Sequence, residues 1–185
     1  MSLTKRGNTK FTAAFVLAIF ITMLTVACGS DSGAREDVSI PRVVASDRIY
    51  TVDDLKVQGV KTVKSYKVDE LPGALAAWNA IYNQLDYEAR FYASHEDAVA
   101  QGTLYADSVT GDDAVVTGDD VLWQEGKSDR RKCSRAAQAP HSSCSYSARY
   151  LEYVIRGNMI LFCEGDESSK AFENCEKFLA LTEPA

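Results

Sequence analysis

Apolar residues concentrate near the N-terminus, where residues 11–27 contain no charged side chain. The first acidic residue of the chain is Asp31, and three basic residues precede the apolar run: Lys5, Arg6 and Lys10. A basic start, then an apolar stretch, then a small residue is the order of parts in a secretory signal peptide. The run is also slightly shorter than the roughly 18 residues expected of a membrane span. The pattern therefore predicts a signal peptide over residues 1–27.

After the apolar run, the pattern predicts a polar tether over residues 28–46 and a single α+β domain over residues 47–185. Helices are expected to begin near Thr51, Pro72 and Ser94, and a last helix is expected over residues 168–181. Strands are expected where β-branched or aromatic residues concentrate or alternate with polar ones: 60–68, 87–93, 114–116, 121–125, 148–156 and 159–163.

This order of elements predicts an α+β fold, with a mixed, largely antiparallel sheet and helices packed on one side. Ala98 and Gly102 are small enough to let the helix that carries them lie close against the sheet. Gly157-Asn158 is a two-residue turn signal, so a hairpin is expected around it. The length of the chain suits one domain with its own core.

The strand expected at 87–93 presents two different faces. Its apolar positions alternate with Glu88 and Arg90, which is the period of a half-buried strand. We expect Glu88 and Arg90 to point the same way and to pair on the solvated surface of the sheet, because two such charges are more often a solvated face than a site.

The end of the apolar run carries a chemical signal. Leu24-Thr25-Val26-Ala27-Cys28 resembles the lipobox of a bacterial prolipoprotein, in which a small residue precedes a cysteine that is acylated and becomes the new N-terminus. Such boxes most often carry leucine three positions before the cysteine, where this chain has Thr25. The resemblance implies lipid attachment at Cys28 and a place on the extracytoplasmic face of the cell membrane. An uncleaved N-terminal anchor and ordinary secretion are the alternatives.

Removal of the signal peptide makes the protein more acidic. The whole chain has 20 basic and 26 acidic residues. Loss of the three basic residues in the signal leaves 17 basic residues and a net charge of −9. An acidic protein is a poor partner for nucleic acid and for anionic lipid. The expected attachment to the membrane is therefore through the N-terminal lipid, and firm attachment needs more than one acyl chain.

The other four cysteines form an even set: Cys133, Cys144, Cys163 and Cys175. In an exported chain such a set predicts two disulfides. We expect Cys133 to pair with Cys144 and Cys163 with Cys175, because each pair closes a short loop and Cys175 lies on the inward stripe of the last helix. Zinc is the competing ligand, but the chain has no C-x-x-C step and no histidine at ligand spacing.

A short repeat, Thr-Gly-Asp-Asp, occurs at 110–113 and again at 117–120. Glycine and aspartate are typical of turns, so two turns around a short strand are expected. A calcium loop is the alternative, but the alternating aspartates and closing glutamate of such loops are missing. No metal or other cofactor is expected.

The segment 126–147 is the most basic part of the chain, and it contains Lys127, Arg130 and Arg131. One interpretation is a surface loop with solvated charges. The other is a contact for an anionic ligand or an acidic partner, since guanidinium groups suit planar oxyanions. We take these three residues as the candidate contact.

Catalytic signals are weak. The two histidines, His95 and His141, have no neighbours that form a known catalytic constellation.

The stretch from Glu88 to Ala98, with the later Gly157-Asn158 turn, resembles an uncharacterised group of bacterial lipoproteins, a resemblance that implies no activity. The sequence thus predicts a lipid-anchored extracytoplasmic lipoprotein that acts as a non-enzymatic binding or interaction module, with an unknown envelope protein or anionic ligand as partner. A cell-envelope hydrolase or carbohydrate-active enzyme is the alternative, and it requires paired carboxylates.

Overall fold

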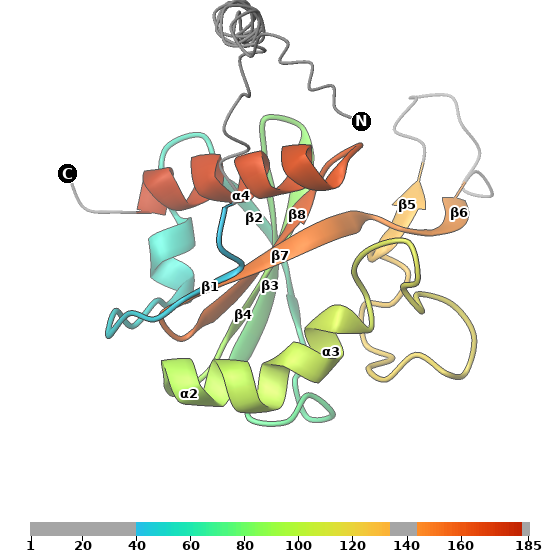
Figure 1. Cartoon of the computed structure of the whole chain (residues 1–185), viewed down its shortest axis with the longest axis horizontal. Coiled ribbons are helices and arrows are strands. Elements are labelled where there is room, and N and C mark those ends of the chain that lie inside the picture. Colours follow the sequence, from blue (N-terminus) through green and yellow to red (C-terminus); the bar gives the residue numbers. More distant parts are fainter. Residues whose placement is uncertain (1–39, 134–143, 183–185) are drawn as a thin grey trace, which may run out of the picture. The chain divides into compact units, whose positions relative to one another are not determined.

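The computed structural model describes residues 40–133 and 144–182 (Figure 1). Cys28, the predicted signal peptide and His141 lie outside these residues. Within the described ranges, no helix combines the length and the apolar character needed to cross a membrane.

A six-stranded sheet with the order β1-β7-β8-β4-β3-β2 forms the centre of the domain. Its neighbouring strands are antiparallel except for β1 and β7, which are parallel. The mixed, largely antiparallel sheet of an α+β fold is therefore confirmed. The strands are β1 (Val43–Val44), β2 (Lys61–Tyr66), β3 (Ala76–Tyr82), β4 (Leu85–Phe91), β7 (Tyr150–Arg156) and β8 (Met159–Glu164). A separate two-stranded sheet pairs β5 (Arg131–Cys133) with β6 (Cys144–Ala148).

Helices cover both faces of the large sheet rather than one, so that part of the prediction is wrong. Helix α4 (Ser168–Thr182) lies on one face, and a continuous helical stretch lies on the other (Figure 1). This stretch consists of α2 (His95–Asp97), the π-helical η2 (Ala98–Gly102) and α3 (Thr103–Asp107). The reason is that β4 and β8 are buried on both faces, so each face needs a cover.

The prediction of a helix after Pro72 is also wrong, because this stretch forms the β3–β4 hairpin. Strands β3 and β4 pair over their full lengths and are joined by Asn83 and Gln84. These two residues have φ angles of 49° and 65°, the left-handed conformation that a tight two-residue hairpin turn requires. The alanines of β3 are small enough for close packing in a sheet, and the pairing with β2 and β4 outweighs the helical spacing of the apolar residues.

Other local predictions are confirmed. Thr51 begins a short 3-10 helix, η1 (Val52–Leu55), with a capping box that includes Asp54. Gly102 lies against the sheet so closely that a Cβ atom there would be 2.4 Å from Ile160 Cδ1. The turn at Gly157 joins β7 to β8 as expected.

Two further expectations fail. Residues 108–130, all of which the structure describes, form turns and bends instead of the strands expected at 114–116 and 121–125. Val43 and Val44, which the prediction places in the tether over residues 28–46, instead pair with Ile155 and Arg156 as strand β1.

Candidate functional site

The predicted basic contact is divided between the surface and the interior. Lys127 lies at the surface, where its Nζ atom donates to Gln124 Oε1 at 2.6 Å. Arg131 is partly exposed, whereas Arg130 is completely buried. Arg130 is therefore withdrawn from the predicted surface contact.

Arg130 binds Glu88, which is also completely buried. Its Nε atom donates to Glu88 Oε2 at 2.9 Å, while the Nε atom of Arg90 donates to Glu88 Oε1 at 2.7 Å. The expectation of a solvated Glu88–Arg90 pair is wrong, because the irregular segment 108–130 covers this face of β4. We call Glu88, Arg90 and Arg130 the charge cluster.

Aromatic rings enclose the charge cluster. The Arg90 guanidinium carbon lies 4.2 Å from the ring centre of Phe162 and 4.9 Å from that of Trp123. The Arg130 guanidinium carbon lies 4.0 Å from the ring centre of Trp123. Such cation–π contacts strengthen when the cation is removed from water. Trp123 therefore attaches its irregular segment to the sheet through Arg90 of β4, and it also packs on Arg130 of the same segment.

The charge cluster holds its carboxylate in the ionised state. Burial by itself raises the pKa of Glu88, but the charges of Arg130 and Arg90 outweigh burial and hold the pKa below its ordinary value of 4.5. Burial also raises the pKa of the nearby Tyr92 to about 12 and the pKa of Tyr150 well above its ordinary range. At neutral pH the carboxylate is charged and the phenols are neutral.

Several donors around the charge cluster are buried and have no hydrogen-bond partner in the described part of the chain. Every one of them carries an N–H or O–H group. They are Arg90 Nη1 and Nη2, Arg130 Nη2, Trp123 Nε1, Tyr92 OH and Tyr150 OH. Buried polar groups are normally paired, so this concentration of donors is unusual.

The hairpin of β5 and β6 presents the exposed part of the basic segment. The predicted disulfide between Cys133 and Cys144 joins its strands, with the two Cα atoms 3.9 Å apart. The guanidinium carbon of Arg131 lies 5.7 Å from the ring centre of Tyr146, a residue that is 79% exposed. The guanidinium group of Arg131 donates to the backbone carbonyls of Ser145 and Cys144, so within the described residues its charge is not paired with a carboxylate. We call Arg131 and Tyr146 the hairpin pair.

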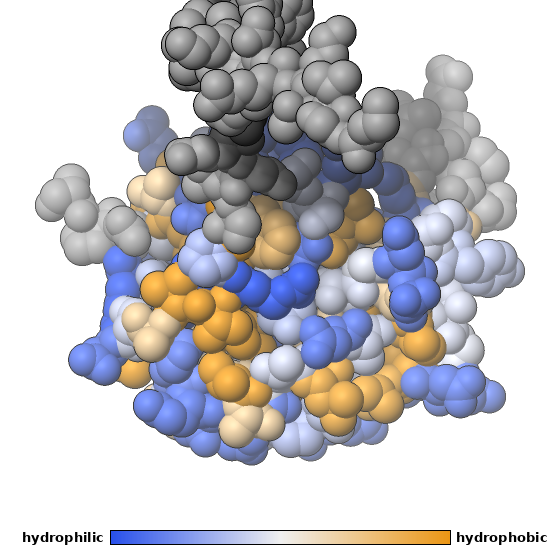
Figure 2. All heavy atoms as spheres, in the orientation of Figure 1, coloured by the Kyte–Doolittle hydropathy of each residue, from blue (hydrophilic) through white to orange (hydrophobic). Residues whose placement is uncertain are grey.

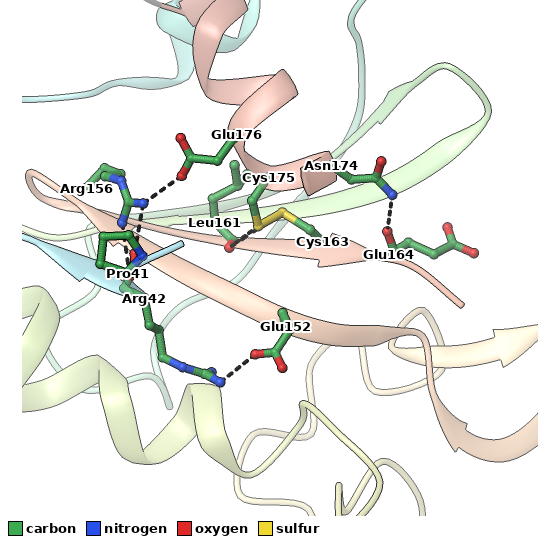
Figure 3. The surroundings of a disulfide bond; sticks show 10 residues. All are labelled: Pro41, Arg42, Glu152, Arg156, Leu161, Cys163, Glu164, Asn174, Cys175 and Glu176. Carbon is green, nitrogen blue, oxygen red and sulfur yellow. Dashed lines mark hydrogen bonds and ion pairs between the residues drawn. A yellow bond between two sulfur atoms is a disulfide. The ribbon is translucent and has the colours of Figure 1, made fainter. Parts of the chain in front are cut away.

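The second predicted disulfide, between Cys163 and Cys175, is also confirmed (Figure 3). Both cysteines are completely buried, and the bond attaches α4 to β8. Asn174 strengthens this attachment by donating to the backbone carbonyl of Glu164 at 2.8 Å.

Comparison with known proteins adds a family but no function. Residues 51–184 match a family of unknown function, DUF6810. The chain belongs to this family. No curated protein and no solved structure matches it.

The part of the chain that matches DUF6810 contains the charge cluster, the hairpin pair and both disulfides. Cys28 and strand β1 lie before it.

The histidine that the structure describes has a structural contact. His95 lies in the first turn of α2, and its Nδ1 atom is 3.0 Å from the carbonyl oxygen of Gly157. Among the described residues, no group of three or more histidine, cysteine or acidic side chains is arranged to hold a metal ion. The aspartates of the two Thr-Gly-Asp-Asp repeats follow Gly111 and Gly118, which have φ angles of 81° and 84°, as in ordinary glycine turns.

The surface around these elements is mixed in character. On the face shown in Figure 2, apolar side chains form small patches separated by polar and charged ones. Exposed apolar residues of the domain include Val43 of β1 and Leu104 of α3, and single exposed apolar residues of this kind are common on folded proteins.

Proposed function

We propose that this DUF6810 protein is a lipid-anchored extracytoplasmic lipoprotein that acts as a non-enzymatic binding or interaction module in the bacterial cell envelope. One observation carries the proposal. Four of the five cysteines are joined in two disulfides, so Cys28 is the one that remains. It stands at the end of the lipobox-like sequence. Disulfides are typical of exported proteins, in agreement with a signal that directs the chain across the membrane.

The hairpin pair is the proposed contact for the partner. Arginine and tyrosine are enriched at protein interfaces and among the residues that contribute most to binding energy. The Cys133–Cys144 disulfide joins the two strands that carry this pair, and a surface salt bridge between Lys132 and Asp166 (Nζ–Oδ1 3.2 Å) connects the hairpin to the segment that follows β8. A rigid contact surface loses less conformational entropy on binding.

The charge of the hairpin pair indicates the chemistry of the partner. Arg131 donates to backbone carbonyls, so its positive charge is available to a carboxylate or another planar oxyanion. Tyr146 adds an apolar ring with a polar hydroxyl group beside it. An acidic surface of an envelope protein suits this combination.

Cell fractionation tests the anchoring. In a bacterial host that processes lipoproteins, the wild-type protein is expected in the membrane fraction, and the variant Cys28→Ser is expected to lose lipid attachment. The double variant Cys133→Ser/Cys144→Ser serves as the control, because it also loses cysteines, here a disulfide-bonded pair, but retains Cys28. Equal incorporation of a labelled fatty acid by wild type and Cys28→Ser would contradict anchoring through this cysteine.

Site-specific photo-crosslinking tests the hairpin pair. A photoreactive residue at position 146 is expected to give a discrete cross-linked product in cells, and Arg131→Ala is expected to reduce the yield of that product. The matched control places the same residue at Leu104, which is 66% exposed and lies on α3. Identical products from both positions, or no effect of Arg131→Ala, would exclude the hairpin pair as the contact.

A further inference from the structure

We propose that the charge cluster binds a small monovalent inorganic anion of the halide class, held by the guanidinium groups of Arg90 and Arg130. This site is internal and is independent of the proposed function in the envelope.

The first argument is the balance of charge. Glu88, Arg90 and Arg130 are completely buried. Glu88 carries one negative charge. Burial lowers the pKa of Arg90, but guanidinium groups stay protonated in proteins, so Arg90 and Arg130 each carry one positive charge. Two ion pairs, Lys64 with Asp129 and Arg149 with Asp86, are balanced in themselves. Charges from these pairs act on the same tyrosines as Glu88 and Arg130. Among the described residues, one positive charge is therefore left without a counter-charge, and an unpaired buried charge is strongly destabilising.

The neighbouring tyrosines do not supply the missing charge. Burial raises the pKa of Tyr92 to about 12 and shifts the pKa of Tyr150 further in the same direction. Their hydroxyl groups stay protonated at neutral pH and can donate hydrogen bonds. No side chain of the described ranges thus supplies the missing negative charge, and an added anion would balance the cluster.

The second argument is the supply of donors. Each guanidinium group has five N–H donors. Arg90 uses its Nε atom on Glu88, which leaves Nη1 and Nη2 free, and Arg130 has Nη2 free. The indole N–H of Trp123 and the hydroxyl groups of Tyr92 and Tyr150 add further donors. An anion accepts hydrogen bonds from all sides, so it satisfies donors that no described acceptor reaches.

The surroundings select the kind of anion. The rings of Trp123 and Phe162 contact the guanidinium groups, and none of the three charged side chains is exposed. A low-dielectric environment strengthens the attraction between ions. Because one charge is unbalanced and the site is enclosed, a small monovalent ion fits better than an organic acid or a divalent oxyanion.

Thermal unfolding of the purified protein in different salts tests the proposal. Chloride and bromide are expected to raise Tm in a saturating manner, as a ligand specific to the folded state does. Sodium gluconate at the same ionic strength is the comparison, since gluconate is too large for the site. Equal Tm values in the three salts at every concentration would overturn the proposal.

Removal of a single hydroxyl group separates specific binding from general salt effects. Tyr150→Phe is expected to raise the chloride concentration at half-maximal stabilisation by about tenfold, because a hydrogen bond to a charged group is lost. Tyr146→Phe makes the same chemical change at an exposed ring and is expected to leave the chloride response unchanged. If Tyr150→Phe stabilises the protein and leaves the chloride response unchanged, its hydroxyl group has no anion to bind and the proposal fails.

A crystal grown in bromide gives a direct view. An anomalous scattering peak within hydrogen-bond distance of the Nη atoms of Arg90 and Arg130 is the expected result. Peaks confined to the surface would mean an adventitious ion only and would overturn the proposal.

Discussion

Glu88 and Arg130 are 42 residues apart in the chain, yet the Arg130 Nε atom lies 2.9 Å from Glu88 Oε2 and both side chains are completely buried. Glu88 belongs to the central strand β4, and Arg130 ends the irregular segment 108–130. The same guanidinium group also donates from Nη1 to the backbone carbonyl of Glu125 at 2.8 Å. This contact therefore fixes a segment that has no regular secondary structure of its own.

Removing the charge of Glu88 is expected to destabilise the fold strongly. Glu88→Gln removes the carboxylate that pairs with both buried guanidinium groups, and breaking a buried ion pair in this way costs about 3–5 kcal/mol. Urea denaturation measures the change in the free energy of unfolding. Glu173→Gln is the matched control, because Glu173 pairs with Lys170 and Lys177 at the exposed surface of α4, where water screens the ion pairs and their loss is expected to change stability little. Equal effects of the two substitutions would contradict the importance of the cluster.

The charge cluster also predicts how stability depends on pH. The pKa of Glu88 is lower in the folded state than its ordinary value of 4.5, so below about pH 4.5 the unfolded chain binds the additional proton. The contribution of Glu88 is therefore fully present above that pH and is lost as pH falls through the folded-state pKa. Unfolding experiments between neutral pH and pH 3 are expected to show a shallower acid slope for Glu88→Gln than for wild type. Parallel slopes would show that Glu88 does not titrate as described.

The two disulfides are expected to differ in their reaction with a reductant. Cys163 and Cys175 are completely buried, whereas Cys133 and Cys144 are partly exposed. Under native conditions dithiothreitol should therefore reduce Cys133–Cys144 first. Alkylation of the released thiols, followed by peptide mass spectrometry, identifies the order of reduction. Reduction of Cys163–Cys175 first would contradict the burial of that bond.

Gly157→Ala is expected to disrupt the β7–β8 turn. Gly157 has a φ angle of 49°, and a Cβ atom there would lie 2.0 Å from the carbonyl oxygen of Arg48. The matched control is Gly111→Ala, because Gly111 also has a positive φ angle but has open space around it. The control is expected to cost about 1 kcal/mol from backbone strain, and Gly157→Ala at least about 1–3 kcal/mol more because the backbone must move. Thermal unfolding of both variants measures the difference, and equal losses would show that the turn has room for a side chain.

The sequence predicts the parts of the fold that depend on local signals. The helix start at Thr51, the Gly157-Asn158 turn and the inward position of Cys175 each follow from a few neighbouring residues, and each is confirmed. The disulfide pairing follows from loop lengths together with the stripe of the last helix. These features need no knowledge of distant contacts.

Other features depend on contacts that the sequence does not show. The helical spacing after Pro72 misleads because two neighbouring strands stabilise β3, and Asn83-Gln84 is a weaker hairpin signal than Asn-Gly. The burial of Arg90 depends on a cover supplied by residues 108–130, which lack a regular period. The Trp123 side chain is the one signal in that segment that indicates an anchor, since a large aromatic residue in a polar loop usually packs against something.

Mass spectrometry of the N-terminal peptide, from protein purified out of its native host, tests the central claim most directly. We expect a mature chain that begins at Cys28 and carries acyl chains on that residue. A chain that retains residues 1–27 and has an unmodified thiol at Cys28 would contradict the proposed lipoprotein.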